Sequence, residues 1–389
     1  MRKKICFCTT LGGTIRAFLV DFSKYLVKHE NYDVTWIAND DNRLHEYINE
    51  HIHLIPLKMK RGFGFDGPRV IWQLYRIFKR EKFDIVQYST RNAGTYASIA
   101  AWIAGIKCRL YCQWGMMFIA LKGIKRALLK WDEKLVVSLS TVVESESFSM
   151  YETAIKHGIY KPEKASVIWH GSACGVNLDR YIMVNKPTWR KEVREELGIS
   201  ENARVFGYCG RITRDKGLNE LFSAFKKVVE DKNRKTDTFL LIIGRKDHAE
   251  TINQELFAWA KSSPFVKFTG YTNNVPKYYS ALDVFTSLSY REGFGLVVIE
   301  AAAMGVPGIV SDALGQRDTI EHGKTGYSVR TYHTEDVVKA MNYFIEHPEK
   351  AIEMGINARK VVDEKYEQKE LLRRLAEHRN LLIEQQALE

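Results

Sequence analysis

Short apolar runs alternate with segments of helical periodicity along the whole chain, and this alternation constrains the fold more than any other feature. The first half holds strand-like runs at Lys4–Thr9, Tyr32–Ala38, Phe83–Ser89, Lys107–Gln113, Thr141–Val143 and Ala165–Trp169. The second half repeats the pattern at Arg204–Cys209, Phe239–Ile243, Val266–Thr269, Val284–Leu288, Gly308–Ser311 and Gly326–Val329. Strands that alternate with helices form parallel sheets covered by helices on both faces. We therefore predict an α/β protein.

The pattern is interrupted at Tyr181–Arg190, a stretch with a lone proline that we interpret as a linker. With 389 residues the chain is long enough for two domains. We predict two Rossmann-like, doubly wound domains at residues 1–185 and 186–365, and a closing amphipathic helix at 366–389 that packs back toward the first domain. Two such domains place a cleft between the carboxyl ends of their strands, where open parallel sheets bind ligands.

No segment of the sequence has the character of a membrane-spanning helix. The longest apolar stretch, Ser98–Ile106, is far shorter than the roughly 18–20 residues that a span needs. The basic start of the chain leads into a few apolar residues and then glycines, so we interpret it as a first strand and not as a signal peptide. The six cysteines lack the spacing of a zinc site. These features predict a cytoplasmic protein.

The positive charge is unevenly distributed along the chain. Of the formal net charge of +11, residues 1–185 contribute +10, because they hold 27 Lys and Arg against 17 Asp and Glu. Such asymmetry indicates an anionic partner for the first half. Composition alone leaves open a membrane surface, a phosphorylated lipid or a nucleic acid.

The first of two motifs with candidate binding chemistry is Gly210–Gly217, in which Arg211 and Lys216 follow a strand that ends at glycine. The planar donors of arginine and the compact charge of lysine suit the two phosphates of a diphosphate. When a diphosphate leaves in a transfer reaction, fixed cations stabilise the transition state more than the ground state. Two solvated cations on a loop are the alternative interpretation.

The second motif runs from Ser289 to Ala301, where a strand leads into a glycine-bearing loop and a helix that we expect to begin near Gly295. Unpaired N–H groups at that helix start can donate to a ligand, and Glu292 in the loop can accept from sugar hydroxyls. Glu300 lies within an apolar stripe, so its carboxylate needs a donor. A ribose diol would supply one, and a neighbouring lysine or arginine is the alternative.

A weaker signal is the Gly12–Gly13 pair that follows the first predicted strand. Glycines allow the backbone to approach a phosphate or an acceptor closely at a helix N-terminus. The pair lacks the third glycine of the dinucleotide-binding fingerprint, so it does not by itself indicate a cofactor site.

Taken together, these motifs resemble those of the retaining GT-B glycosyltransferases of family 4. The resemblance rests on G-R-x4-K-G at Gly210–Gly217, on E-G-F-G-L-x3-E at Glu292–Glu300 and on the segment Gly323–Tyr327. The stretch His170–Tyr181 is similar to the G-S-x2-G-V-D pattern of bacterial transferases that extend polyprenyl-diphosphate-linked sugars. The resemblance implies a GT-B fold with an interdomain cleft.

The resemblance also implies roles for individual residues. Arg211 and Lys216 would bind the donor diphosphate, Glu292 would contact the transferred sugar, and these three would be the catalytic residues. Glu300 would bind the ribose. Further donor contacts are expected from Gly12, Gly13, Gly210, Gly244, Tyr271, Val275, Gly293, Phe294, Gly295 and Leu296. Family members retain the anomeric configuration without a side-chain nucleophile, and no metal or cofactor is expected.

The first half departs from the family pattern at one point. Many relatives carry a histidine before a glycine after the strand that corresponds to Arg109–Gln113, where it meets the donor. Here Trp114 stands before Gly115, and a shift of one residue would place Gln113 in that position. Arg91 is a further candidate near the reaction centre or the acceptor.

The acceptor side is predicted from the segment Gly115–Lys134, which mixes apolar residues with the cations Lys122, Lys125, Arg126 and Lys130. Such a segment can lie at a membrane interface, with its apolar face down and its cations on lipid phosphates. A surface helix packed on the sheet is the alternative. Arg61–Phe65 is a second candidate contact. We predict peripheral attachment to the inner face of the cell membrane, next to a lipid-linked glycan acceptor.

The implied reaction is transfer of a hexosyl or N-acetylhexosaminyl group from a nucleotide sugar to a polyprenyl-diphosphate-linked glycan, in bacterial surface polysaccharide biosynthesis. UDP is favoured as the nucleotide, and a GDP-mannose-dependent mannosyltransferase is the alternative. A non-hydrolysing epimerase would need acid–base carboxylates and histidines in the cleft. A non-enzymatic nucleic-acid-binding protein is the alternative of another class, but no recognition motif for nucleic acid is visible, so we expect no such partner.

Overall fold

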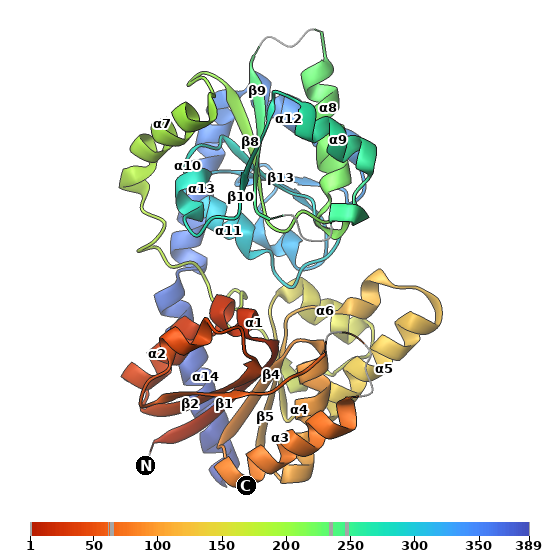
Figure 1. Cartoon of the computed structure of the whole chain (residues 1–389), viewed down its shortest axis with the longest axis vertical. Helices are drawn as coiled ribbons and strands as arrows, with labels where there is room; N and C mark the ends of the chain where they lie inside the picture. Colours follow the sequence, from red (N-terminus) through yellow and green to blue (C-terminus); the bar gives the residue numbers. More distant parts are fainter. Residues whose placement is uncertain (1, 61, 63–65, 233–235, 246–248, 389) are drawn as a thin grey trace. The chain divides into compact units, whose positions relative to one another are not determined.

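The computed structural model describes residues 2–60, 62, 66–232, 236–245 and 249–388. The chain divides into two compact units (Figure 1). The first comprises residues 1–174 and 369–389, and the second comprises residues 175–368.

The first unit is built on a seven-stranded sheet in the order β3-β2-β1-β4-β5-β6-β7, in which every pair is parallel. Its strands are β1 (Lys3–Leu11), β2 (Tyr32–Asn39), β3 (Ile52–Pro56), β4 (Ile85–Ser89), β5 (Cys108–Gln113), β6 (Val142–Ser145) and β7 (Ala165–Ser166). Its helices are α1 (Gly12–Phe18), α2 (Val20–His29), α3 (Gly67–Glu81), α4 (Arg91–Ala104), α5 (Gly123–Leu139), α6 (Phe148–Lys156) and α14 (Gln368–Leu388). The strand order reverses between β1 and β4, and such a reversal opens a crevice at the carboxyl ends of the strands.

Helices cover both faces of this first sheet. On one face, apolar side chains of α2 and α14 join those of β1 and β2 in a single buried cluster. On the other face, α4 contacts β1, β4 and β5 and packs between α3 and α5. The sheet is therefore buried on both sides, as the continuous apolar runs of its central strands require.

The second unit has a six-stranded parallel sheet in the order β10-β9-β8-β11-β12-β13. Its strands are β8 (Arg204–Cys209), β9 (Thr238–Ile243), β10 (Val266–Gly270), β11 (Val284–Ser287), β12 (Gly308–Ser311) and β13 (Gly326–Val329). Its helices are α7 (Lys186–Leu197), α8 (Leu218–Glu230), α9 (Gln254–Ser262), α10 (Val275–Ser280), α11 (Leu296–Ala303), α12 (Thr334–Glu346) and α13 (Pro348–Lys365). One core cluster joins the sheet to α8, α9 and α12, and another joins it to α10, α11 and α13. The order reverses at β8, which lies between β9 and β11.

Three details differ from the sequence-based expectations. Strand β3 was not predicted, because only Ile52 of Ile52–Pro56 is buried at this sheet edge, and a histidine and a proline interrupt its apolar residues. The predicted linker Tyr181–Arg190 is wrong at its C-terminal end, since α7 begins at Lys186 and accommodates Pro187 in its first turn. A proline is tolerated there because the first N–H groups of a helix have no intrahelical partner.

The division between the units also falls earlier than residue 185. Residues from Gly175 onward belong to the second unit, where the Val176 N–H donates to the Tyr366 carbonyl at 2.8 Å. In return, the Gln368 N–H donates to the Val176 carbonyl at 2.9 Å. These two hydrogen bonds tie the start of the second unit to the end of α13 and the start of α14.

Helix α14 is held in the first unit by a buried ion pair between Arg379 and Glu144 of β6. Arg379 is 1% exposed and also donates to Gln87 Oε1 at 2.9 Å. Burial acts to raise the pKa of Glu144, but Arg379 and His378 outweigh it and lower the pKa to about 2. The pair is therefore ionised at neutral pH, and each charge depends on the other.

We expect Arg379→Met to lower the free energy of unfolding of the first unit by about 3–5 kcal/mol, because it leaves the Glu144 carboxylate enclosed without its cation. Chemical denaturation measures the loss. The double variant Arg379→Met with Glu144→Met removes both charges and should recover part of it. Arg373→Met, on the exposed side of the same helix, is the matched control and should have little effect. An equal loss from Arg373→Met would contradict this account.

Candidate active site

The candidate donor-binding residues of the second unit meet at one edge of its sheet. Gly210 follows β8, Gly244 follows β9, Tyr271 follows β10, and Glu292 lies in the loop after β11. These strands are neighbours and parallel, so their carboxyl ends lie together. This is the edge at which ligands bind in sheets of this type.

Two glycines bring the loops after β8 and β9 into contact. Gly244 has φ +141°, and a Cβ atom there would lie 2.0 Å from the Gly210 carbonyl oxygen. Gly210 itself has φ +151°, and its N–H donates to the Ile243 carbonyl at 2.9 Å. Any side chain at position 244 would displace the loop that carries Arg211, so glycine is required by close approach of the two backbones.

Arg211 and Lys216 lie on the loop after β8, and Lys216 is the last residue of a short 3₁₀ turn in that loop, η5 (Arg214–Lys216). The Tyr208 hydroxyl donates to the Arg211 carbonyl at 2.6 Å and fixes the backbone at that residue. The Arg211 Nη2 atom lies 3.8 Å from Asp215 Oδ2, and both side chains are partly exposed. The guanidinium is thus held near one carboxylate while remaining accessible to a ligand.

Lys216 joins the two sequence motifs. Its Nζ lies 2.5 Å from Glu292 Oε1, and their side chains are only 22% and 19% exposed. A lysine ammonium has three donors, so the bond to Glu292 leaves capacity for an anionic ligand. Gly217, next in the chain, has φ +73°, and a Cβ atom there would lie 2.1 Å from the Leu288 carbonyl oxygen. Close backbone packing therefore sets the position of Lys216 against the end of β11.

The loop with Glu292 is also fixed by its backbone. The Glu292 N–H donates to the Leu314 carbonyl at 3.1 Å. Gly315 has φ +78°, and a Cβ atom there would lie 2.4 Å from the Gly293 carbonyl oxygen. Gly295, with φ +103°, precedes the first residue of α11, as the sequence predicts. The Glu292 carboxylate and the start of α11 are therefore presented at the same edge as Lys216.

Glu300, on α11, has hydrogen-bonding partners that the sequence did not reveal. The Tyr279 hydroxyl donates to its Oε2 at 3.5 Å, and the Tyr181 hydroxyl is a second donor. Burial raises the pKa of Glu300 to about 7, although both tyrosines and Arg180 act to lower it. The lysine or arginine partner that was the alternative to a ribose diol is absent among the ion pairs of the described residues. The carboxyl group is consequently poised between its neutral and charged forms at physiological pH.

The other predicted donor contacts differ in what their side chains do. Phe294 is 1% exposed and packs edge-on against Tyr366, so only its backbone is available to a ligand. Tyr271 is 59% exposed, and the Arg245 guanidinium lies 5.9 Å from its ring centroid. Val275 is the first residue of α10, and Leu296 is the first of α11. Tyr271 is therefore the exposed aromatic surface in this group.

In the first unit, Gly12 and Gly13 lie where β1 meets α1. A Cβ atom at Gly12 would lie 2.7 Å from the Asn39 carbonyl oxygen, so packing within the unit already explains this glycine. Beside it, the Thr10 N–H donates to the Thr90 hydroxyl at 3.0 Å across the reversal between β1 and β4. Thr90 has φ +66°, which is strained for a β-branched residue. Sequence reasoning did not single out this residue.

Gln113 and Trp114, the two replacements for the family histidine, have different surroundings. Gln113 is fully buried, and its Nε2 donates to Glu133 Oε1 at 2.6 Å while its Oε1 accepts from the Tyr160 hydroxyl at 3.2 Å. Burial raises the pKa of Glu133 to about 7. Trp114 is partly exposed and packs against Phe18, with ring centroids 5.3 Å apart. Trp114 is thus the more accessible of the two.

Arg91 begins α4, just after β4. Its Nε lies 3.7 Å from Asp132 Oδ2 on α5. The Thr95 hydroxyl also donates to Asp132, at 2.9 Å. Arg91 therefore lies at the carboxyl edge of the first sheet, next to the network of Gln113 and Glu133.

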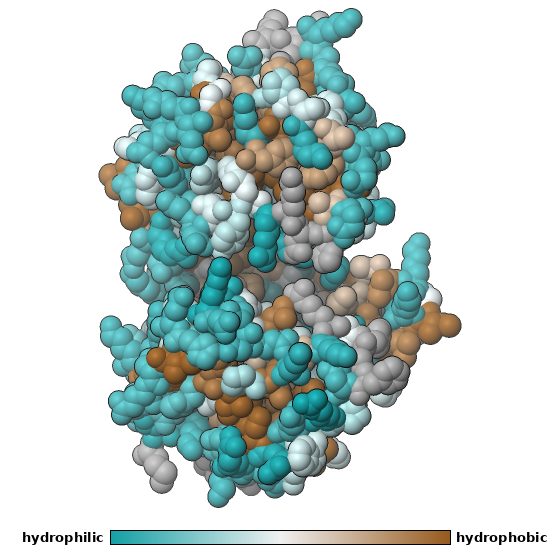
Figure 2. All heavy atoms as spheres, in the orientation of Figure 1, coloured by the Kyte–Doolittle hydropathy of each residue, from teal (hydrophilic) through white to brown (hydrophobic). Residues whose placement is uncertain are grey.

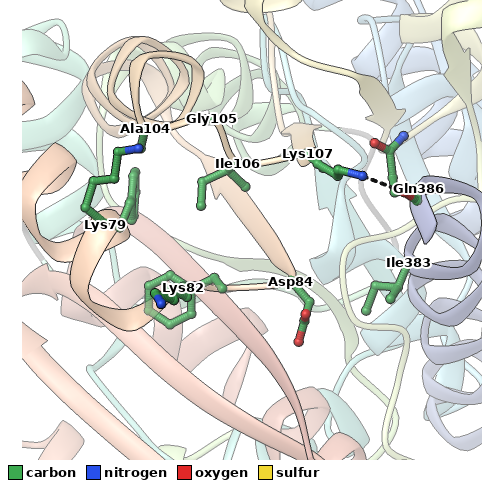
Figure 3. A pocket seen from close by; sticks show the side chains of 11 residues that line it. Lys79, Lys82, Asp84, Ala104, Gly105, Ile106, Lys107, Ile383 and Gln386 are labelled. Carbon is green, nitrogen blue, oxygen red and sulfur yellow. Dashed lines mark hydrogen bonds between the residues drawn. The ribbon is translucent and has the colours of Figure 1, made fainter. Parts of the chain in front are cut away.

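The first unit has a hollow of about 440 Å³, shown in Figure 3, and none of Gly12, Gly13, Arg91, Gln113 and Trp114 lines it. Asp84 and Lys107 line it at the amino ends of β4 and β5, the edge opposite to the predicted site. Among the described residues, no three His, Cys, Asp or Glu side chains gather as a metal site would require.

Helix α5 carries an exposed apolar stripe. Ile124, Leu128 and Trp131 are 80%, 51% and 64% exposed, at a spacing that places them on one helix face. Figure 2 shows hydrophobic side chains at the right-hand edge of the first unit, where α5 lies. Met116 and Phe118, from the same predicted segment, are buried instead. No helix in the described part of the chain has both the length and the apolar content to cross a bilayer.

The fold and the clustered motifs define a two-domain glycosyltransferase of the GT-B type. Residues 190–361 match the family model "Glycosyl transferases group 1", and residues 15–180 match "Glycosyltransferase Family 4". The chain belongs to the GT-B glycosyltransferases of family 4.

Individual relatives agree with this assignment. The chain is 29% identical over 340 residues to the capsular polysaccharide biosynthesis glycosyltransferase CapM of Staphylococcus aureus, covering 87% of each chain. It is 26% identical to the UDP-Gal:alpha-D-GlcNAc-diphosphoundecaprenol alpha-1,3-galactosyltransferase of Escherichia coli, covering 85% of this chain and 84% of that one. Its fold resembles that of Anabaena HepE, solved in complex with UDP, with a TM-score of 0.78 at 19% identity, covering 97% and 99% of the two chains.

Proposed function

We propose that this glycosyltransferase moves a sugar from a nucleotide-sugar donor to a lipid-diphosphate-linked glycan, with retention of the anomeric configuration. The observation that carries the proposal is the contact between Lys216 and Glu292, which brings the two family motifs together at the carboxyl edge of the second sheet. A cation for the diphosphate and a carboxylate for the transferred sugar then lie side by side.

In this proposal, Arg211 and Lys216 hold the donor diphosphate. As the bond between the sugar and the diphosphate breaks, negative charge grows on the departing diphosphate. The two cations therefore stabilise the transition state more than the ground state. Glu292 accepts hydrogen bonds from the sugar hydroxyls while it holds the Lys216 ammonium in place. These groups perform the transfer without a metal ion or a cofactor.

The nature of the substrates rests on the relatives. The E. coli relative is named for a UDP-sugar donor and a diphosphoundecaprenol-linked acceptor, and CapM is named for capsular polysaccharide biosynthesis. HepE was solved with UDP. We therefore propose UDP as the nucleotide, a hexosyl or N-acetylhexosaminyl group as the transferred sugar, and bacterial surface polysaccharide biosynthesis as the process.

A lipid-linked acceptor requires access to the membrane surface, and α5 supplies a suitable face. Its exposed stripe of Ile124, Leu128 and Trp131 is flanked by Lys122 and Lys125, both exposed. Apolar side chains at the level of the lipid headgroups and cations on lipid phosphates together bind an anionic surface. We propose that α5 docks the first unit on the inner face of the membrane. The other predicted contact, Arg61–Phe65, lies outside the described residues apart from Gly62.

We expect Arg211→Ala and Lys216→Ala each to lower kcat/KM by the equivalent of about 2–4 kcal/mol, because each removes a cation that faces the leaving diphosphate. A thermal-shift panel of UDP, GDP and ADP identifies the nucleotide, and hydrolysis or transfer of the corresponding sugar gives the rates. Lys226→Ala, a lysine on α8 paired with Glu230, is the matched control. Glu292→Gln should impair turnover, and undiminished activity in that variant would remove Glu292 from the site.

If Glu300 binds the ribose diol, donor affinity should rise between pH 6 and pH 8. The reason is that the pKa of Glu300 is about 7, and the charged carboxylate accepts hydrogen bonds better than the neutral acid. Calorimetry with UDP-glucose should show a gain approaching about tenfold, which is the change in the ionised fraction across this range. Glu300→Gln should flatten the profile, and Tyr279→Phe should shift its midpoint upward. An unchanged profile in Glu300→Gln would separate Glu300 from donor binding.

The membrane contact predicts that the protein floats with anionic vesicles at low salt and less so at high salt. The triple variant Ile124→Ser, Leu128→Ser and Trp131→Ser should lose most of this binding, because it removes the apolar face while it keeps the net charge. Trp102→Ser, a residue on α4 of similar exposure, is the control. Absence of wild-type flotation at low salt would refute the docking of α5.

A further inference from the structure

A second cavity in the second unit lies at the sheet edge opposite to the donor residues. Its volume is about 640 Å³, within the range of small-molecule sites. Arg204 at the start of β8, Asp283 just before β11 and Gly305 just before β12 line it, and all three belong to the amino ends of the strands. It is therefore separate from the residues that the glycosyl transfer uses.

The cavity lining has an excess of positive charge. Four cations line it, Lys186, Arg190, Arg204 and Arg359, against the single acid Asp283. That acid is already engaged, because its two oxygens accept from Arg190 Nη2 at 2.6 Å and from the buried Arg194 Nη2 at 2.9 Å. The Val205 N–H also donates to it, at 2.8 Å. No carboxylate of the lining is left for the remaining cations.

Two of these cations form no ion pair in the described part of the chain. Lys186 Nζ donates only to the Gly305 carbonyl, at 3.1 Å, and burial together with Arg190 lowers the pKa of Lys186 to about 8. The Arg204 Nε atom is enclosed and has no hydrogen-bond partner among the described residues. An enclosed donor of a charged group costs free energy unless an acceptor reaches it. The missing acceptor fits an anion.

The rest of the wall is apolar. Met183, Leu282 and Ala351 contribute to it, and Ile352 and Ile356 lie one turn apart on α13. These isoleucines are 67% and 66% exposed, which is high for large aliphatic residues at the rim of a cavity. A ligand that covered them would remove apolar surface from water.

We propose that this cavity binds an amphipathic anion, with a phosphate or carboxylate head against Arg204 and Lys186 and an aliphatic chain along Ile352 and Ile356 of α13. The cations without an ion-pair partner favour a ligand with an anionic head, and the exposed isoleucines favour a ligand with an aliphatic chain. A free phosphate would leave the isoleucines uncovered, and a neutral amphiphile would leave the positive charges of Arg204 and Lys186 without a counter-charge.

The hollow in the first unit is also lined by cations, but these differ from Arg204 in their exposure to water. Three lysines line it, Lys79, Lys82 and Lys107, and all are exposed to water. Lys107 Nζ donates to the Gln386 carbonyl at 3.3 Å, as Figure 3 shows. Hydrated lysines of this kind need no ligand, unlike the enclosed Arg204.

Calorimetric titration of the full chain with octyl phosphate, inorganic phosphate and octyl glucoside tests the proposal. We expect octyl phosphate to bind about tenfold or more tightly than either of the others, since only it has both parts. Arg204→Met should lower the affinity for octyl phosphate about tenfold or more, because it removes a charge-assisted hydrogen bond. Lys360→Met, a 73% exposed lysine on α13, is the matched control and should bind as the wild type does. Ile352→Glu should lower the affinity for octyl phosphate and leave the affinity for inorganic phosphate unchanged.

Binding that Arg211→Ala abolishes would place octyl phosphate in the donor site and overturn the proposal. Equal affinity for octyl phosphate and octyl glucoside, or equal behaviour of Arg204→Met and Lys360→Met, would also overturn it. Flotation with vesicles that contain phosphatidic acid separates the two sources of such a ligand when it is measured in the triple variant Ile124→Ser, Leu128→Ser and Trp131→Ser, which lacks the proposed α5 contact. Flotation of this variant that Arg204→Met abolishes identifies a bilayer lipid. Flotation that Arg204→Met leaves unchanged, or absence of flotation, together with lost octyl phosphate binding identifies a dispersed amphiphile. None of these results depends on whether the enzyme transfers a sugar.

Discussion

The ion pair between Lys216 and Glu292 is the interaction on which the candidate donor site depends. The two residues lie 76 positions apart in the chain, on loops after adjacent strands, and their atoms meet at 2.5 Å. Because both side chains are largely enclosed, each charge limits where the other can go. Lys216 and Glu292 are thereby both kept at the carboxyl edge of the sheet. A ligand that bears both phosphate and hydroxyl groups matches this pair, because the phosphate can bind the Lys216 ammonium and the hydroxyl groups can donate to the Glu292 carboxylate.

Glycine makes that arrangement possible at the level of the backbone. At Gly244, Gly217 and Gly315, a Cβ atom would lie 2.4 Å or less from a carbonyl oxygen of the neighbouring loop. The loops after β8, β9, β11 and β12 therefore approach one another more closely than residues with side chains allow. Such packing positions the functional groups before a ligand arrives, which lowers the free-energy cost of ordering them upon binding.

The sequence predicted much of the fold, because buried parallel strands leave long apolar runs that are easy to recognise. It does not reveal β3, whose edge position makes its pattern mixed, or the start of α7, whose first turn contains a proline that is also typical of linkers. The donor motifs were found because their residues lie close together along the chain. The partners of Glu300 and Gln113 were not, since Tyr181, Tyr279 and Glu133 come from distant elements that only the folded chain brings near. Residues that lie close together along the chain can be recognised as a motif from the sequence, whereas hydrogen-bond partners from distant elements become visible only in the folded structure.

The docking of α14 has a consequence for biosynthesis. The side chains of Leu371, Leu372, Leu375, Ala376 and Leu382 complete a core whose other buried members lie in the first half of the chain. The ribosome must therefore synthesise all of the second unit before the first can bury its full hydrophobic surface. Until then the nascent first unit exposes the apolar surface that α14 later covers, and the Glu144 carboxylate lacks its ion-pair partner Arg379. Ribosome-associated chaperones that shield such grooves have a defined period in which to act on this enzyme.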